Sequence, residues 1–234
     1  MGGPADADTS VHRRVAVLGG LGVRPMLRLS LPGRRLLAYL ALKGHSLSRS
    51  AASAELWPDL PEEVGRANLR RALWHLPPDW VTTIGEDLLL EAETDLADAH
   101  RSAMRALSGE AISLTEIGVL TEDVLPGWHD EWAVSAHEAF RLLRVQALEA
   151  ACRSMATQGT FALATQAGAA AVAAEPLRES AVEALIEAHL AQHNRYDAIQ
   201  CFRGLTNRLN IELGVDPDPD LARKVGSLSL LLQR

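Results

Sequence analysis

The chain has 234 residues, of which 47% are hydrophobic and only 4% aromatic, and it carries a net charge of −7 at pH 7. This length allows one large domain or two small ones, and the abundance of Ala and Leu favours helices over sheets. No apolar run approaches the roughly 20 residues that a membrane-spanning helix needs. Two cysteines are too few for a disulfide framework, so we expect buried thiols in a cytoplasmic protein. Residues 1–12 lack the apolar segment of a signal peptide and are expected to form a disordered tail.

The charge is distributed unevenly along the chain. Residues 10–76 contain eleven Lys or Arg and four Asp or Glu, a net charge of +7, which leaves −14 for the remainder. Arg66, Arg70 and Arg71 fall in one short helical pattern, with no acidic residue between Val64 and Leu76. A basic segment in an otherwise acidic protein is typical of a module that binds a polyanion such as nucleic acid.

The first ninety or so residues predict a small module of strands and helices. Residues 14–18 and 27–31 alternate apolar and polar side chains between glycines and prolines, which indicates two short strands. Apolar residues then recur at helical spacing in three segments, which are residues 34–43, 48–57 and 62–76. A β-hairpin follows, with strands at Trp80–Ile84 and Leu88–Leu90 and a turn at Gly85–Asp87. A hairpin after three helices is the arrangement of a winged helix-turn-helix.

After a boundary near Ala92–Leu96 the pattern is helical. Helices are predicted at residues 95–107, 130–157, 161–174, 178–193 and 195–213, and a last one starts at Pro219. Residues 155–161 resemble residues 190–196 at an offset of 35 residues, close to the period of about 34 residues in tetratricopeptide helix pairs. We therefore predict a mainly α protein with a small β part. A winged helix-turn-helix at residues 13–93 precedes an all-α, tetratricopeptide-like domain at residues 94–234.

The predicted helix at residues 62–76 has two different faces. Its apolar face consists of Leu69, Ala72, Leu73 and Leu76. Its other face carries Asn68, Arg70, Arg71, Trp74 and His75. Arg pairs with the O6 and N7 atoms of guanine and Asn with adenine, so this face suits a DNA major groove. The alternative is an ordinary solvated face, with Trp74 packed against the second domain.

Seven stretches of the chain carry a family resemblance. In the N-terminal part they are VAVLGGLGV at 15–23, LPGRRLLAYLAL at 31–42, SLSRSAASAELWPD at 46–59 and GRANLRRALWHL at 65–76. In the helical part they are VLPGWHDEWAVSAHEAFRLLRVQALEA at 124–150, AAEPLRESAVEALIEAHL at 173–190 and ELGVDPDPDL at 212–221. Together they resemble the Streptomyces antibiotic regulatory proteins (SARPs). These transcriptional activators join an OmpR-like winged helix to a bacterial transcriptional activator domain (BTAD).

The resemblance implies a function and a set of site residues. It implies a protein that binds directly repeated sites on double-stranded DNA, where a homodimer would sit, and that recruits RNA polymerase. Residues 62–76 would be the recognition helix, and Trp80–Glu91 would contain the wing. The implied DNA-binding residues are Arg49, Arg66, Asn68, Arg70, Arg71, His75, Thr82 and Thr83. Two departures bear on DNA binding: the wing tip Gly85–Asp87 is acidic, and Pro77–Pro78 ends the recognition helix early.

These departures keep a rival function open, that of a tetratricopeptide-type interaction or ligand-sensing module whose winged helix no longer reads DNA. A small-molecule effector in the helical part is also open, although the sequence names no polar group that would orient one. The chain has no phosphate-binding loop, nucleophile elbow or zinc motif, so we expect neither catalysis nor a cofactor. His189 and His193 stand four residues apart in a predicted helix, but no third ligand is evident and a metal site is not expected.

Three further patterns in the helical part have structural interpretations. Trp128 and Trp132 are expected to pack the start of a long helix against a neighbour, with Asp130 as its cap. Asp216–Asp220 resembles a calcium loop but is better explained as a rigid turn before a helix. The solvated face of the long helix is expected to contain Glu138, Arg141, Arg144 and Glu149.

Overall fold

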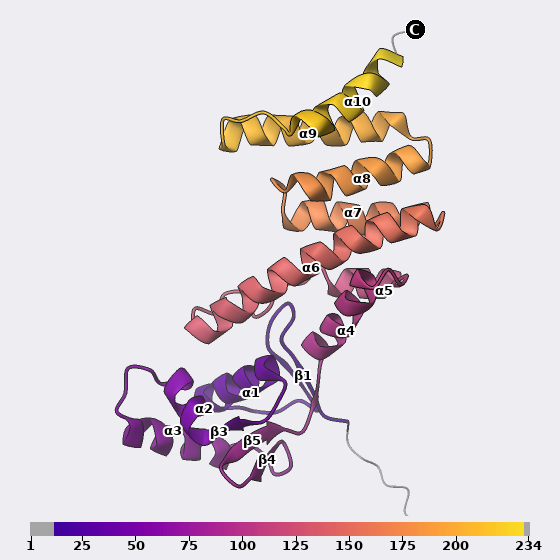
Figure 1. The fold of residues 1–234 in the computed structure, drawn as a ribbon. Helices are drawn as coiled ribbons and strands as arrows, with labels where there is room; N and C mark the ends of the chain where they lie inside the picture. The colour runs from indigo at the N-terminus through magenta and orange to yellow at the C-terminus, as the bar shows by residue number, and fades with distance from the viewer. Residues whose placement is uncertain (1–11, 232–234) are drawn as a thin grey trace, which may run out of the picture. The chain divides into compact units, whose positions relative to one another are not determined.

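The structure is a computed structural model that describes residues 12–231, with side chains described as far as residue 226. Its contacts divide it into two compact units (Figure 1). Unit 1 consists of Met1–Asp98 and Asp123–His137, and unit 2 consists of Ala99–Glu122 and Glu138–Arg234. The tail expected at residues 1–12 lies outside the described residues, apart from His12. The domain boundary between residues 93 and 94 stays a prediction.

A three-stranded sheet opens unit 1. Strand β1 (Arg14–Ala16) pairs antiparallel with β2 (Gly22–Arg24) and parallel with β6 (Glu93–Thr94). Val15 and Val17 are fully buried. The carboxylate of Asp95 accepts hydrogen bonds from the backbone N–H groups of Val17 and Leu18, at 2.8 and 3.1 Å. These bonds hold the end of the first strand to the residue that follows β6.

The strand predicted at residues 27–31 is wrong. The partner of β1 lies earlier in the chain, and helix α1 (Leu31–Lys43) begins where the predicted strand was to end. The hydroxyl of Ser30 accepts a hydrogen bond from the backbone N–H of Gly33 at 3.3 Å, and Pro32 occupies the first turn. A cap and a first-turn proline both favour helix initiation, so they outweigh the alternation of Leu27, Leu29 and Leu31.

The rest of unit 1 is the predicted winged helix-turn-helix. Two further helices are α2 (Arg49–Leu56) and α3 (Glu62–Trp74). A second sheet has the order β3-β5-β4, with β3 (Leu47–Ser48), β4 (Val81–Ile84) and β5 (Asp87–Leu90). Leucines from all three helices and the sheet are buried, among them Leu36, Leu40, Leu56, Leu69 and Leu88. The fold class predicted from the sequence is confirmed.

A second chain segment, Asp123–His137, completes unit 1. Its backbone pairs with the residues after β1, through Gly19 N–H to the Asp123 carbonyl and Leu125 N–H to the Val17 carbonyl, both at 2.8 Å. The start of helix α6 (Glu131–Thr157) brings the Trp132 ring edge-on to the ring of Tyr39, with 5.5 Å between centroids. Both rings are buried.

The aromatic pair at the start of α6 packs as predicted. The Trp128 and Trp132 rings are 5.7 Å apart in an edge-on arrangement. Asp130, immediately before the helix, forms an ion pair with Arg35 of α1. Burial, with a smaller contribution from the carboxylate of Glu55, raises the pKa of Tyr39 above its ordinary value. Tyr39 is therefore an uncharged core residue at any physiological pH.

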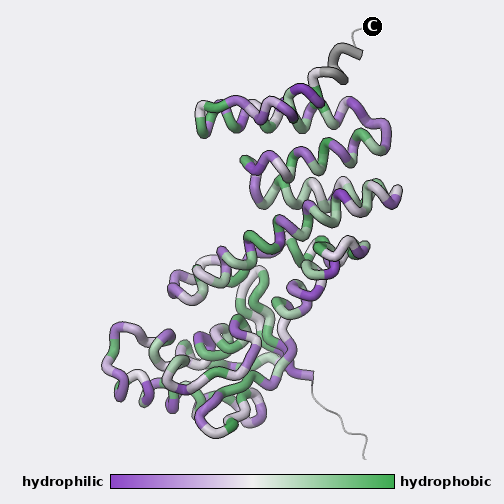
Figure 2. The backbone as a smooth tube through the Cα atoms, viewed as in Figure 1, coloured by the Kyte–Doolittle hydropathy of each residue, from purple (hydrophilic) through white to green (hydrophobic). Residues whose placement is uncertain are grey.

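Unit 2 consists of helices. Helices α4 (Asp95–Leu107) and α6 begin in unit 1 and continue in unit 2. The other helices of unit 2 are α5 (Leu114–Val119), α7 (Phe161–Ala174), α8 (Glu179–Ala191), α9 (Arg195–Glu212) and α10 (Pro219–Leu231). Hydrophobic and hydrophilic residues alternate along most of these helices (Figure 2). One core joins α8, α9 and α10 through buried residues that include Val182, Ile186, Leu205, Leu209 and Leu221. Consecutive antiparallel helices of this kind confirm the tetratricopeptide-like architecture.

Close packing in unit 2 depends on small side chains. A Cβ atom added at Gly168 of α7 would lie 2.8 Å from the sulfur of Cys152 on α6 and 3.1 Å from the Leu185 side chain on α8. Only glycine fits without a shift of both neighbours. Cys152 is fully buried, and burial raises the pKa of its thiol to about 12. Cys201 is only partly buried, and both thiols are free.

The predicted solvated face of α6 is partly wrong. Glu138 is exposed, but Arg144 and Glu149 are each only 5% exposed. Arg144 donates to the backbone carbonyls of Thr121 and Glu122, just after α5. Glu149 accepts from Arg178 at 2.6 Å and also from the Ser180 hydroxyl. Because α6 has neighbours on more than one side, its buried arc includes positions that a simple amphipathic pattern assigns to solvent.

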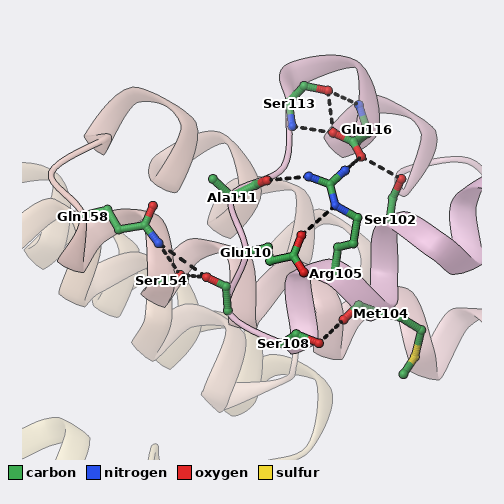
Figure 3. A network of polar contacts seen from close by, with 11 residues as sticks. Ser102, Met104, Arg105, Ser108, Glu110, Ala111, Ser113, Glu116, Ser154 and Gln158 are labelled. Carbon is green, nitrogen blue, oxygen red and sulfur yellow. Dashed lines mark hydrogen bonds and ion pairs between the residues drawn. The ribbon is translucent and has the colours of Figure 1, made fainter.

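A polar network fixes the connection between α4 and α5 (Figure 3). Arg105 of α4 forms ion pairs with Glu110 at 3.0 Å and Glu116 at 2.6 Å. Ser113 and Glu116 form a reciprocal capping box at the start of α5. The pKa of Glu116 is lowered, chiefly by the hydrogen bond that its carboxylate accepts from the backbone of Ser113, although burial acts in the opposite direction. The hydroxyls of Ser113 and Ser102 and the charge of Arg105 lower it further. The carbonyl of Gly109 accepts from the Ser154 hydroxyl of α6 at 2.7 Å.

Two minor predictions have different outcomes. The sequence predicts a single helix that contains both His189 and His193, and this prediction is wrong. Helix α8 ends at Ala191, and His193 has a backbone φ of 62°. Within the described residues, no group of three or more His, Cys, Asp or Glu is arranged to hold a metal ion.

The turn before α10 is as predicted, because the carboxylate of Asp218 accepts from the N–H groups of Asp220 and Leu221. Between residues 12 and 231, no helix combines the length and apolarity that crossing a membrane requires.

Candidate nucleic-acid interface

Helices α2 and α3 cross closely at a glycine. A Cβ atom on Gly65 of α3 would lie 2.6 Å from the hydroxyl oxygen of Ser53 on α2. Glu62 and Glu63 stand in the first turn of α3, where carboxylates interact favourably with the helix dipole. Leu69 and Ala72 bury the inner face. This packing fixes the angle at which the outer face of α3 is presented.

The outer face of α3 is polar and cationic, as the sequence predicts. Arg66, Arg70, Arg71 and His75 are exposed, and Asn68 is partly buried. Trp74 is 85% exposed at the last residue of the helix. Large aromatic side chains are usually mostly buried. Trp and Tyr are enriched at interfaces with partners.

The arginines of α3 differ in their existing partners. Arg66 forms an ion pair with Glu62 one turn earlier at 2.8 Å. Arg71 donates to the Asn68 side-chain oxygen at 3.3 Å. The guanidinium of Arg70 has no hydrogen bond or ion pair to another residue in the described part of the chain. Arg70 is therefore free to bind a partner without losing an interaction inside the fold.

The start of α2 is joined to the β4–β5 hairpin. Ser48 caps α2 by accepting from the backbone N–H of Ala51 at 3.2 Å. The backbone N–H of Arg49 donates to the carbonyl of Glu86 at 2.9 Å. The guanidinium of Arg49 donates to the hydroxyl of Thr83 on β4 at 3.1 Å. Two predicted site residues that lie 34 positions apart in the sequence are thus in direct contact.

A cavity of about 370 Å³ connects these parts. Its lining contains the predicted site residues Arg49, Arg70 and Thr83 together with Trp74. The rest of the lining comes from Leu73, Leu76, Pro77, Pro78, Asp79 and Val81. Two guanidinium groups and an indole ring at one cavity form a surface suited to a polyanion with flat bases.

A comparison with protein families decides the class of the chain. The model of the bacterial transcriptional activator domain matches residues 86–227, more than half of the sequence. The chain belongs to the bacterial transcriptional activator domain family. This match agrees with the resemblance of its sequence, which implied such a domain in the helical part. No curated protein matches the sequence of this BTAD protein.

The fold of the BTAD protein is similar to that of a solved structure. This is Mycobacterium tuberculosis EmbR in complex with a low-affinity phosphopeptide, with a TM-score of 0.65 and 21% sequence identity. The similarity covers 95% of this chain and 66% of the EmbR chain. At this identity the comparison supports the fold alone. The BTAD protein spans slightly less than two thirds of the length of that relative.

The family match leaves the site to be judged on geometry. The matched segment begins at residue 86 and therefore excludes every predicted DNA-binding residue. Of these residues, the structure joins Arg49 with Thr83 and Asn68 with Arg71. His75 and Thr82 are not part of the cavity lining. The prediction omitted Trp74, although its place on the polar face of the helix was visible in the sequence.

Proposed function

We propose that this regulator reads specific sequences of double-stranded DNA by placing α3 in the major groove. The observation that carries the proposal is the outer face of α3. This face presents Arg70, Arg71 and Asn68 beside the contact between Arg49 and Thr83. The major groove admits one α-helix, and Arg and Asn are the side chains that distinguish guanine and adenine there.

Different residues would have different roles on the duplex. Arg70 and Arg71 are suited to guanine edges and Asn68 to adenine, with His75 at the end of the same face. Arg66 and Arg49 lie at the start of α3 and α2, positions suited to phosphates. Thr82 and Thr83 on β4 would accompany Arg49 as contacts of the wing with the DNA backbone. Phosphate contacts of this kind set the register of the helix but do not select bases.

We further propose that the protein acts in the cytoplasm as an activator that recruits RNA polymerase. The SARP resemblance supports this role and supports binding of a homodimer to directly repeated sites. The acidic charge of the chain outside residues 10–76 repels DNA and would favour contact through unit 1. The helical unit would then be available to contact protein partners.

A second candidate function rests on the wing. Its turn exposes Glu86, and α3 already ends at Trp74. A carboxylate near a phosphate is unfavourable, and a short recognition helix makes fewer contacts. Under this candidate the protein is a tetratricopeptide-type interaction or ligand-sensing module whose winged helix does not read DNA.

Selection from a randomised pool of duplex DNA at 150 mM salt separates the two functions. The wild-type protein is compared with Arg70→Ala/Arg71→Ala and with Arg203→Ala, an exposed arginine of α9 outside the proposed site. Enrichment of a repeated motif by the wild type and Arg203→Ala, but not by the double variant, supports the DNA reader. No enrichment by a folded wild-type protein supports the second candidate.

A further inference from the structure

Unit 1 contains a second and larger cavity, of about 890 Å³. It is formed by the β1–β2 hairpin, the irregular segment at residues 25–30 and the first turn of α1. Its lining consists of Arg14, Ala16, Leu21, Gly22, Val23, Arg24, Met26, Leu27, Arg28, Leu29, Arg34 and Asp95. None of the predicted DNA-binding residues is among them.

The cavity carries positive charge that the fold does not neutralise. Arg14 is paired with Asp98 at 2.5 Å and Glu93 at 3.6 Å. The guanidinium groups of Arg24, Arg28 and Arg34 form no hydrogen bond or ion pair with another residue in the described part of the chain.

The one carboxylate in the lining does not offset these arginines. It belongs to Asp95, and both of its oxygens accept from backbone N–H groups, those of Val17 and Leu18. Three arginines of the lining therefore have no counter-charge bound to their side chains. Guanidinium groups bind carboxylate and phosphate through paired, charge-assisted hydrogen bonds.

The position of Arg34 strengthens this conclusion. Arg34 stands in the first turn of α1, a helix of 13 residues whose first turn contains no acidic residue. The positive end of the helix dipole lies there and disfavours a cation. A bound anion would remove this unfavourable interaction as well as balance the arginines. The dipole and the side chains thus act in the same direction.

The remaining lining is apolar. Leu21, Val23, Leu27 and Leu29 are all partly exposed, and Met26 is 93% exposed. Small-molecule sites have volumes of about 300–1,000 Å³ and combine apolar walls with a few polar groups that orient the ligand. This cavity has that size and that combination. A DNA phosphate, which is surrounded by sugars and water, would leave the apolar walls unused.

We propose that this cavity binds a small amphipathic anion, a molecule with a carboxylate or phosphate group on an apolar body. The anionic group would bind Arg24, Arg28 and Arg34. The apolar body would contact Leu27 and the flexible side chain of Met26. This places a ligand site in unit 1, whereas the sequence left a small-molecule effector open only for the helical part. The site does not depend on whether α3 reads DNA.

The test is a titration of the full chain, labelled at its methionine methyl groups, with 1-naphthyl phosphate. Met26 lines the cavity, whereas Met104 and Met155 lie in unit 2 and serve as internal references. Met26→Leu assigns the signal. We expect the Met26 methyl resonance to shift in a saturable manner while those of Met104 and Met155 stay unchanged. Neutral 1-naphthalenemethanol and inorganic phosphate should each bind more weakly by about tenfold or more, since each lacks one half of the recognition.

Substitutions of the three arginines test whether they bind the anionic group of the probe. The triple variant Arg24→Gln/Arg28→Gln/Arg34→Gln should lower the affinity for 1-naphthyl phosphate by about tenfold or more, because charge-assisted hydrogen bonds are lost. Arg195→Gln, at an exposed arginine of unit 2, should bind as the wild type does. If the triple variant does not fold, Arg28→Gln alone tests the site, because Arg28 is exposed in a segment without regular structure.

Three results would overturn the proposal. One is the absence of a Met26 shift at millimolar probe. Another is equal binding of the neutral analogue. The third is a change in salt-dependent DNA affinity when Arg24, Arg28 and Arg34 are replaced, since this would assign the arginines to the DNA interface.

Discussion

Replacing Arg70 with Gln tests the orientation of α3 on DNA. The Arg70 side chain is exposed and has no hydrogen bond or ion pair among the described residues, so its replacement removes no such interaction from the fold. The free energy of unfolding should change by no more than about 0.5 kcal/mol. The affinity for the selected duplex should fall by about 1–3 kcal/mol if Arg70 pairs with guanine. A large loss of binding in a variant of normal stability would place Arg70 at the interface.

The salt dependence of binding separates a base contact from a phosphate contact. If Arg49, Arg66, Arg70 and Arg71 all contact phosphates, the slope of log affinity against log salt is about −3.6, at about 0.9 for each contact. The affinity then falls about 150-fold between 50 and 200 mM salt, and about 40-fold after Arg70→Gln. If Arg70 contacts a base instead, wild type and variant share one slope, and the variant binds more weakly at every salt concentration.

The assay is fluorescence anisotropy of a labelled duplex at four salt concentrations between 50 and 200 mM. Arg203→Gln on α9 is the matched control, because it also removes one exposed arginine and should leave affinity and slope unchanged. The reasoning is refuted if Arg70→Gln changes neither the affinity nor the slope. In that case the outer face of α3 does not meet DNA.

Three other predictions concern stability and reactivity. Trp132→Ala should lower the free energy of unfolding by about 3–5 kcal/mol in a denaturant titration, because Trp132 packs on Tyr39 in the core. The control Trp74→Ala, at an 85% exposed position, should change the free energy of unfolding by no more than about 0.5 kcal/mol. Glu116→Gln should lower the Tm at pH 7. Because the folded state lowers the pKa of Glu116, its carboxylate stabilises the fold above the unfolded pKa of about 4.3, and the Tm difference should shrink as the pH falls below that value; a constant difference from pH 7 to pH 3 would contradict this. At pH 8, a thiol reagent should leave Cys152 unmodified in the native protein and modify it after unfolding, because burial raises its pKa to about 12.

The sequence predicts helices well where periodicity and end signals agree. Helix α1 stops at Gly44, which adopts the left-handed conformation expected of a C-terminal cap. The prediction failed at residues 27–31, where alternation indicated a strand but the capping side chain of Ser30 started a helix. It also failed at Arg144 and Glu149, whose burial depends on partners from other helices. Such tertiary partners leave no periodic signal in one segment.

The candidate DNA site was predictable in part. The cationic face of α3 follows from helical geometry, because residues on one face recur at fixed spacing. The contact of Arg49 with Thr83 depends on how the hairpin lies against α2, which local sequence does not specify. The cavity lined by Arg24, Arg28 and Arg34 was not foreseen, because residues 27–31 were expected to form a strand.

The discontinuity of unit 1 limits how such a protein can be rearranged during evolution. The rings of Tyr39 and Trp132 pack in one core. In the sequence, however, the two residues are separated by residues 99–122, which belong to unit 2. Exchange of the N-terminal unit at a single point in the gene would leave Tyr39 without its aromatic neighbour and Arg35 without Asp130. A new N-terminal unit must therefore arrive with a matching segment at residues 123–137. This requirement favours inheritance of the two units as a pair.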